Sequence, residues 1–573
     1  MAGETFSSAL LVEVGGAELP PEIAALLVHG YVEDSRNLLD TFLLRFRDPG
    51  HLVVEKGGLT VGAKVTLKAQ TSDPGPPVTL MTGEVAGLTL DLDAAGTITE
   101  VRGFDAAHRL MRGRRVAAYP NMTVSDVVRQ VARRANIPVG QIDPLPGVGG
   151  RLHTQLSQDN VSDWTFLTRL ADRVGAQVGV SDGKLFFRLP APPSGAPGPT
   201  EKAEQNPLVL EADANLVSLR ASVTAASQTA EVEVRGWDYE HKQEITATAT
   251  PALKEAGADP AELGRTFGAP TVLAGVSGHR TQAEVKAAAD ALAADLGGTA
   301  VELDGVAKGN PRLRAGAAVS LAGVGAPFAG KYTLSGTRHL FSPDTGYTTA
   351  FSVSGRQDRS LYGLASRGAS GVAHGLVPAI VSNIKDPLTM GRVCLTFPWL
   401  SGEFTSGWAR VAQPGAGKDR GLELLPEVGD EVLVGFENGD FDSPYVLGGL
   451  RNGTDTAPSL SAAVVDDTSG QVAVRALVSR AGHRLEFLEE PGAVRLSTGD
   501  EQVTLTLDGK SGAVVIKGAK GVTVDAGTGA MEVTATSGIT LDAGTGPLEL
   551  KGSRVTVSGQ ADVTVTGAII KLN

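Results

Sequence analysis

The sequence predicts a mainly β protein, and three observations support this fold class. Of the 573 residues, 42% are hydrophobic and 20% are charged, which is typical of folded chains and excludes a disordered one. The 72 glycines, with 5% aromatic residues, suit many tight turns between short strands. The third observation is a ladder of very short alternating strands from about residue 483 onward.

The first 120 residues or so are expected to form strands. Apolar residues alternate there, as in Phe42, Leu44 and Phe46, and Pro/Gly breakers such as DPG at 48–50 separate the runs. Three helices follow along the chain, at about 123–134, 162–174 and 281–296, because apolar residues recur there every three to four positions. Their expected end signals are Thr123 or Ser125, Ser162 with Gly175, and the capping box Thr281–Glu284 with Gly297.

Residues 363–376 are small and flexible and indicate a domain boundary. Short strands with turns between them follow over 377–450. Five or so strands in about 75 residues are the size of a small closed barrel such as an OB-fold.

The C-terminal ladder has a mean period of eight residues. VTVDAGTG at 522–529 recurs as ITLDAGTG at 539–546, seventeen residues on. Eight residues allow one short strand and one turn, with about two apolar side chains per strand, which is too little core for a lone chain. Three chains wound about one axis would pair every strand and share an interior, so we expect a stiff, homotrimeric rod. The alternative is a single-chain parallel β-helix, whose rungs usually need roughly twenty residues.

The order of several motifs resembles the VgrG-type central spike of contractile injection systems, the fused counterpart of a phage baseplate hub and needle. The OB segment carries the most specific similarity. The matching stretches are VRGFDAAHRLMR at 101–112, YPNMTVSDVV at 119–128, QDNVSDWTFLTRLADRVGA at 158–176, GNPRLRAGAAVSL at 309–321, GRVCLTFPW at 391–399, LPEVGDEVLVGFENGD at 425–440 and GHRLEFLEE at 482–490.

The resemblance implies four regions. Residues 1–370 would be a baseplate hub-like region of two β-barrel modules plus helices, and 371–455 an OB-fold. Residues 456–480 would be a linker or neck, and 481–573 a triple-stranded β-helical needle formed by a homotrimer. Three copies would present six similar barrel modules, which would let a threefold spike meet a sixfold tube.

The implied function is a non-enzymatic spike that seeds the inner tube and punctures the target envelope. Its partners would be the inner tube protein and baseplate components at the hub, with the target membrane met only mechanically. Met1–Leu10 lacks a basic flank, so we expect synthesis in the bacterial cytoplasm without a signal peptide and action in a phage tail-like particle. The alternatives are a type VI secretion spike that also carries effectors, a spike with a fused hydrolase, and a β-helical adhesin or lyase.

Catalytic and cofactor chemistry is not expected. Cys394 is the single cysteine, which excludes an intrachain disulfide and Cys-based zinc sites. No GxSxG, HExxH or P-loop motif occurs, and no His-x-His pair follows His483 to hold a tip metal. Asp466 and Asp467 are expected to be solvated, and His108 to make a structural contact. The net charge of −13 argues against nucleic acid as a partner.

Two sets of needle residues are predicted to carry the function. Val555, Val557, Val563 and Val565 alternate with polar residues and are expected to face the shared core. At the C-terminus, Ile569, Ile570 and Leu572 would form a small apolar platform on the threefold axis. The family resemblance implies that this platform seats a PAAR-type tip protein. The alternative is that these residues close the last layer of the core.

Overall fold

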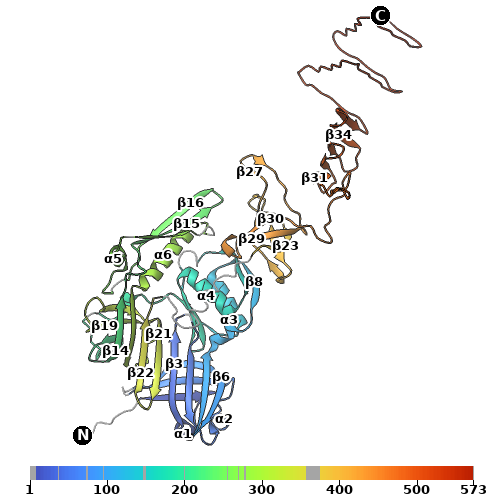
Figure 1. The fold of residues 1–573 in the computed structure, drawn as a ribbon. Helices are drawn as coiled ribbons and strands as arrows, with labels where there is room; N and C mark the ends of the chain where they lie inside the picture. Colours follow the sequence, from blue (N-terminus) through green and yellow to red (C-terminus); the bar gives the residue numbers. More distant parts are fainter. Residues whose placement is uncertain are drawn as a thin grey trace, which may run out of the picture. The chain divides into compact units, whose positions relative to one another are not determined.

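The chain folds into two compact units, Met1–Asp455 and Thr456–Asn573 (Figure 1). The fold is mainly β, as the sequence predicts. The computed structural model describes residues 8–571, apart from 37, 72–74, 95, 146–149, 199, 254–255, 269, 276–278 and 356–374.

The larger unit begins with antiparallel strands around an apolar core. Phe42, Leu44 and Phe46 alternate toward this core and are almost fully buried, which confirms the strand pattern. Its elements are β1 (Ala9–Val14), β2 (Ala17–Glu18), α1 (Pro21–Ala24), β3 (Leu27–Ser35), β4 (Thr41–Arg47), α2 (Leu52–Glu55), β5 (Lys64–Gln70), β6 (Val78–Asp93) and β7 (Gly96–Asp105).

A helical segment follows with a core of its own. Thr123 and Ser162 cap its two helices by accepting hydrogen bonds from the backbone N–H of Asp126 and Thr165, and Gly175 ends the second helix at φ 71°. Its elements are η1 (Ala106–Met111), β8 (Arg115–Met122), α3 (Val124–Arg134), β9 (Val139–Ile142), β10 (His153–Val161), α4 (Asp163–Val174), β11 (Gln177–Ser181) and β12 (Lys184–Arg188).

A second β region follows the helical segment. It contains β13 (Val209–Glu211), β14 (Leu216–Val223), β18 (Val301–Lys308), β19 (Ala318–Ala322), β20 (Gly330–Thr333), β21 (Gly336–Ser342) and β22 (Gly346–Val353). Between β14 and β18 lies an insertion of β15 (Glu231–Asp238), β16 (Gln243–Ala249), α5 (Pro260–Arg265), β17 (Thr271–Gly275) and α6 (Gln282–Gly298).

Helix α6 begins as predicted and ends later than predicted. The Thr281–Glu284 capping box is present, with both reciprocal hydrogen bonds. The helix does not close at Gly297, however, but continues to Gly298 with Thr299 as its C-cap. Gly297 and Gly298 are buried, and a Cβ on Gly297 would approach the Ala252 backbone within 3.2 Å, so this glycine provides close packing rather than a helix end.

One continuous sheet joins the two β regions. Its strand order is β14-β18-β22-β21-β3-β4-β7-β6-β5-β1-β2, and β21 pairs antiparallel with β3 at the junction (Figure 1). Phe341 and Tyr347, from the second region, stack on each other in the core of the first. The two regions therefore share a core as well as a sheet.

The larger unit ends in a six-stranded barrel with strand order β25-β24-β23-β29-β30-β26. Phe397, Phe404 and Phe441 pack at its centre, and Cys394 is buried in one of its strands. The strands are β23 (Val377–Asn383), β24 (Cys394–Phe397), β25 (Ser401–Thr405), β26 (Arg410–Val411), β29 (Glu431–Phe436) and β30 (Pro444–Gly449), and the hairpin β27 (Ala416–Gly417)–β28 (Arg420–Gly421) extends from it.

The smaller unit contains one five-stranded antiparallel sheet of successive hairpins. Its first strand, β31, lies inside the segment 456–480 that was expected to be a linker, because Val474 and its neighbours pair with the following strand. The strands are β31 (Val474–Val478), β32 (Arg484–Leu488), β33 (Ala493–Ser497), β34 (Val503–Asp508) and β35 (Ala513–Gly518). Beyond Gly518, the strands expected at Val522–Val524 and onward are not formed in the described part of the single chain.

Candidate functional site: an apolar sheet face in the C-terminal unit

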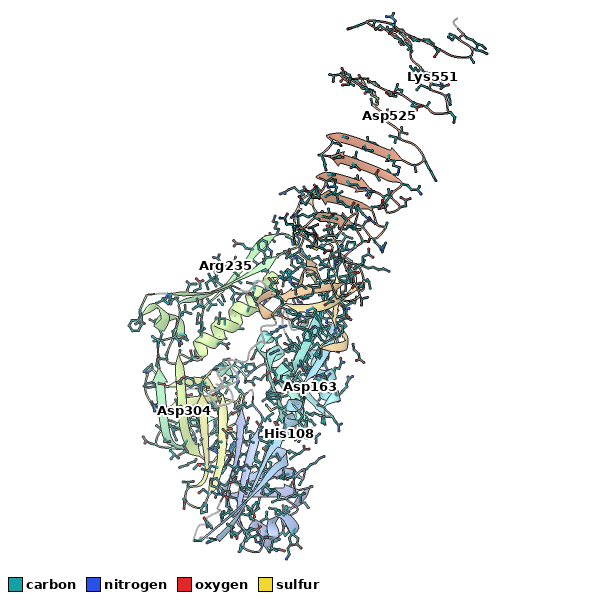
Figure 2. The ribbon with its side chains drawn as sticks, turned by 45° about the vertical axis from the view of Figure 1, so that its right-hand side comes forward. His108, Asp163, Arg235, Asp304, Asp525 and Lys551 are labelled. Carbon is teal, nitrogen blue, oxygen red and sulfur yellow. The ribbon has the colours of Figure 1, made fainter. Side chains whose placement is uncertain are left out.

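One face of the sheet β31–β35 carries apolar residues on every strand, and Arg475 on β31, opposite Phe487, is its one charged residue. Residues directly opposite each other on neighbouring antiparallel strands lie on the same face. The apolar cross-strand pairs on this face are Leu477–Leu485, Leu485–Leu496, Phe487–Val494, Leu496–Leu505, Val494–Leu507, Leu505–Ile516 and Leu507–Val514. Figure 2 shows these five strands stacked as a ladder.

This apolar face is exposed in the single chain. Phe487 is 45% exposed, Leu496 53% and Ile516 62%. A contiguous apolar surface of this kind marks an interaction site, because a soluble protein rarely leaves such an area in contact with water.

The opposite face of the same sheet mixes polar and apolar residues, and the chain itself covers part of it. Glu486 is fully buried there and accepts hydrogen bonds from the backbone N–H of Ser461, at 2.8 Å, and from its hydroxyl. Arg495, directly across from Glu486, donates to the Ser461 hydroxyl at 3.1 Å and to Glu501 at 2.9 Å. The polar groups around Glu486 therefore have intramolecular partners, whereas the apolar face is left exposed.

The two sequence repeats after the sheet form the same turn. Asp525 Oδ1 accepts a hydrogen bond from Gly527 N at 2.8 Å, and Asp542 Oδ1 accepts one from Gly544 N at the same distance. Gly527 and Gly544 have φ values of 58° and 57°, a conformation that glycine adopts without strain. Figure 2 labels Asp525 at its turn. The DAGTG motif thus forms the same backbone turn at both of its positions.

The predicted core residues of the needle are exposed in the single chain. Val555 and Val563 are 54% exposed, Val557 69% and Val565 66%, and in the described part of the smaller unit none of them joins a buried cluster. Their inward orientation stays a prediction, because it depends on neighbouring chains.

The predicted tip platform is described only in part. Ile569 is 78% exposed and Ile570 51%, and Leu572 lies outside the described residues. Neither isoleucine joins a buried cluster of the described residues.

Within the larger unit, Tyr239 links the six-stranded barrel to the β15–β16 hairpin. The Arg392 guanidinium, itself paired with Asp386 at 2.6 Å, donates to the Tyr239 hydroxyl at 3.3 Å. Arg280 and Arg410 each lie 5.0 Å from the centre of the Tyr239 ring. No local sequence pattern predicts this contact, because the arginines around Tyr239 come from separate elements.

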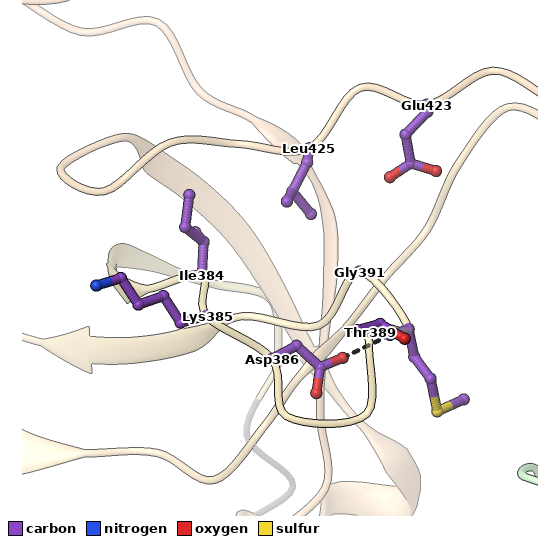
Figure 3. Close-up of a pocket in the computed structure, with 8 residues that line it drawn as sticks. Ile384, Lys385, Asp386, Thr389, Gly391, Glu423 and Leu425 are labelled. Atoms are coloured by element: carbon purple, nitrogen blue, oxygen red, sulfur yellow. Dashed lines mark hydrogen bonds between the residues drawn. The ribbon is translucent and has the colours of Figure 1, made fainter.

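The barrel also has a shallow cavity of about 490 Å³ beside the loop after β23 (Figure 3). Two carboxylates, Asp386 and Glu423, line it. Asp386 already accepts hydrogen bonds from the backbone of Leu388, Met390 and Arg392 and from the Arg392 side chain. The Arg392 hydrogen bond and these backbone bonds hold the pKa of Asp386 well below its usual range. The Asp386 carboxylate therefore uses its hydrogen bonds to fix the loop after β23.

A partly buried ion pair, Arg314 with Asp34, holds the junction between the two β regions. Arg314 Nε donates to Asp34 at 2.7 Å, and the backbone N–H of Ala315 donates to the same carboxylate at 3.1 Å. Nearby, burial lowers the pKa of His339 to about 3, with a further contribution from the charge of Arg314. His339 is therefore neutral at neutral pH and accepts or donates one hydrogen bond with Tyr347 at 2.9 Å.

The residues weighed as catalytic candidates in the sequence have structural partners. His108 contacts Glu84 at 2.8 Å, as expected of a structural contact (Figure 2). Asp466 accepts hydrogen bonds from the backbone of its own turn. Among the described residues, no group of three or more His, Cys, Asp or Glu is arranged to hold a metal ion. In the same residues, no helix has the length and apolar character needed to cross a bilayer.

Two family models match the sequence. One describes the type VI secretion system/phage-baseplate injector OB domain and covers residues 377–450, the range of the six-stranded barrel. The other describes an Alg8 N-terminal domain and covers residues 75–342, across parts of both β regions. The second match carries no functional statement for this chain.

Curated relatives match over a short stretch. The type VI secretion system spike protein VgrG3 of Vibrio cholerae is 47% identical over 72 residues, which are 12% of this chain and 7% of that protein. The spike protein VgrG2a of Pseudomonas aeruginosa is 42% identical over 72 residues, 12% of this chain and 9% of that protein. The match thus spans less than a tenth of each relative.

A solved structure extends the likeness to most of the chain. The half-lidded PdpA–VgrG complex of Francisella has a TM-score of 0.52 at 8% sequence identity, and the match covers 89% of this chain and 88% of that one. At this identity the likeness concerns the fold alone. Residues 377–450 therefore match the injector OB domain in sequence, and the chain as a whole shares the fold of this VgrG complex.

Proposed function

We propose that this protein is a homotrimeric, non-enzymatic spike at the centre of a contractile injection baseplate. It seeds the inner tube at its hub and leads the tube through a target envelope. The observation that carries this proposal is the apolar face of the sheet β31–β35, which has no partner in the described part of the chain. Three such faces turned toward a common axis would bury each other and form a rigid rod.

The mechanical role follows from this arrangement. A rod whose strands belong to three chains unfolds only when the chains separate, and slow unfolding is the property that a puncturing device needs. The Tyr239 contact between barrel and hub, with Arg392 and Arg410, supports the same role because it fixes one folded part to the next.

Assembly in the bacterial cytoplasm and action in a phage tail-like particle are part of the proposal. A type VI secretion spike has the same fold, and the names of the two curated relatives favour that setting. The non-enzymatic role is proposed on the residues of this chain. One further relative is named an actin cross-linking toxin, but it matches over 72 residues and 7% of its length, so its activity is not transferred here.

The test of the spike function is particle assembly. Deleting the gene from its host should abolish assembled tube–sheath particles in electron micrographs, and the wild-type gene should restore them. Normal numbers of complete particles without the protein would contradict the proposal.

The tip is proposed to seat a PAAR-type protein on Ile569, Ile570 and Leu572. The exposed isoleucines support this, because threefold symmetry would gather them at one end of the rod. A chain truncated after Gly567 should remain trimeric and lose the tip protein in a pull-down. Full retention of the tip protein by the truncated spike would reject this docking site.

A further inference from the structure

The chain concentrates positive charge between the end of β7 and the end of α3. Residues 102–134 contain eight arginines and two aspartates, with no lysine or glutamate, which gives a net charge of +6 with histidine neutral. The whole chain has a net charge of −13, so this stretch opposes the sign of the rest. A local reversal of charge of this kind favours association with an acidic partner.

Four of the eight arginines pair with carboxylates of the chain. Arg109 shares Glu84 with His108, and Arg134 pairs with Asp163 at 2.6 Å. Figure 2 labels His108 and Asp163 in these pairs. The two other pairs are Arg102–Glu100 and Arg129–Asp126. Each of these carboxylates thus already has at least one cationic partner.

The other four arginines have no carboxylate partner among the described residues, and all four are exposed. They are Arg112, Arg114, Arg115 and Arg133, and we call them the basic patch. Three of them lie within four consecutive residues, where their like charges repel each other. An acidic surface placed against the patch would replace this repulsion by attraction.

Two contacts hold the end of α3 beside the arginine run at 112–115. Arg109 Nη1, three residues before the run, donates to the carbonyl of Asn136, just beyond the helix, at 3.4 Å. Arg134 Nη1, in the last turn of α3, donates to the hydroxyl of Tyr119 at 3.0 Å. Tyr119 belongs to β8, the strand that follows the run. The patch therefore lies on neighbouring elements of one segment, which has its own core.

The surroundings of the patch favour an acidic protein over a nucleic acid. Sites for single-stranded nucleic acid combine basic groups with exposed aromatic rings on which bases stack. The aromatic rings in the core of this segment are buried, with Tyr119 at 1% exposure, Trp164 at 2% and Phe166 at 4%. A long phosphate backbone would also be repelled by the rest of a chain with net charge −13. A short acidic segment would contact the patch alone.

We propose that the basic patch docks an acidic surface of another protein, whose Asp or Glu side chains pair with Arg112, Arg114 and Arg115. The planar guanidinium suits this partner, because it can donate to both oxygens of one carboxylate. The inference rests on the proposed function in one respect, since in a baseplate the acidic protein is another component of the particle. The pairing itself is a property of this surface.

Binding of a fluorescent oligoglutamate peptide to the full-length protein, followed by anisotropy at low salt, tests the patch. The triple variant Arg112→Ser, Arg114→Ser and Arg115→Ser should bind the peptide about tenfold more weakly, because each exposed ion pair contributes a few-fold in affinity. The three side chains are exposed, so the fold should be preserved. Light scattering checks that the variant keeps the wild-type mass.

The matched control removes the same charge from dispersed positions. Arg220→Ser, Arg312→Ser and Arg420→Ser change exposed arginines on β14, on the loop before β19 and on β28. This variant should bind the peptide within about twofold of the wild type, because charges farther away than the Debye length are screened. Equal weakening by both triple variants would mean that net charge alone attracts the peptide, and would overturn the patch.

A second probe and the particle assay separate the remaining outcomes. A single-stranded DNA oligonucleotide of equal charge should bind more weakly than the peptide. Tighter binding of the DNA, lost in the Arg112/Arg114/Arg115 variant, would overturn the acidic protein in favour of a nucleic acid. A wild-type protein that does not bind oligoglutamate would overturn the patch and leave the spike function standing. If deletion of the gene leaves particles intact while the variant loses the peptide, the spike function fails and the patch stands.

Discussion

His339 lies at the junction of the two β regions, and its burial there determines its protonation state. It is fully buried on β21, and its Nδ1 lies within hydrogen-bond distance of the hydroxyls of Tyr347 and Thr349. Because burial lowers its pKa to about 3, the folded protein holds it neutral, whereas the unfolded chain binds a proton near pH 6.5. The unfolded state therefore binds more protons than the folded state between these two values.

The free energy of unfolding should consequently fall as the pH drops from about 6.5 toward 3, by up to about 1.4 kcal/mol per pH unit from this group. Denaturant unfolding at pH 7, 5.5 and 4, at one protein concentration, would measure the slope. The variant His339→Leu should be less stable at pH 7 but show a shallower loss on acidification. Equal slopes for the variant and the wild type would refute this role of His339.

At the residue scale, the sequence predicts the environment of some side chains and not of others. A lone cysteine in an apolar strand predicts a buried thiol, and Cys394 is buried. Tyr239 could not be found, because its partners Arg280, Arg392 and Arg410 come from different elements and no periodicity relates them. Local patterns report local structure, whereas such a contact depends on the tertiary fold.

At the scale of elements, β35 shows how the apolar face depends on strand alternation. Ile516 lies on the apolar face opposite Leu505, and Lys517 lies on the other face opposite Thr504. Neighbouring residues of one strand point to opposite sides, so the two positions separate the effect of a face from the effect of a strand.

The variant Ile516→Asp should weaken the trimer, because three carboxylates would enter one apolar interior at a cost of several kcal/mol per charge. Lys517→Asp is the matched control and should keep the wild-type mass and melting temperature within a few degrees. Light scattering and thermal unfolding of both variants measure this. If the two substitutions have the same effect, the assignment of the inward face is wrong.

Helix ends were predictable because side chains determine them locally. Thr123, Ser162 and the Thr281–Glu284 box cap their helices as the sequence indicates. The end of α6 was not predictable, since Gly297 is needed for packing against Ala252, which the sequence does not reveal. Strand β31 was not predicted for a similar reason. It is a strand because it pairs with β32, and the sequence does not reveal that pairing.

At the scale of the whole molecule, the chain has its open surfaces where a second copy would be needed. In the larger unit, β14 and the second half of β6 each pair with one neighbouring strand among the described strands. The smaller unit exposes the apolar face of β31–β35. The family resemblance implies two similar modules in the hub, and the large sheet contains one strand order twice, as β3-β4-β7-β6 and β14-β18-β22-β21, which no residue pattern reveals.

The central claim is that the apolar face of β31–β35 is covered by other copies of the chain. Multi-angle light scattering of the full-length protein at micromolar concentration tests it most directly. The account predicts one species of about 177 kDa, three times the 59.0 kDa of the chain. A folded, stable species of 59.0 kDa under the same conditions would contradict it.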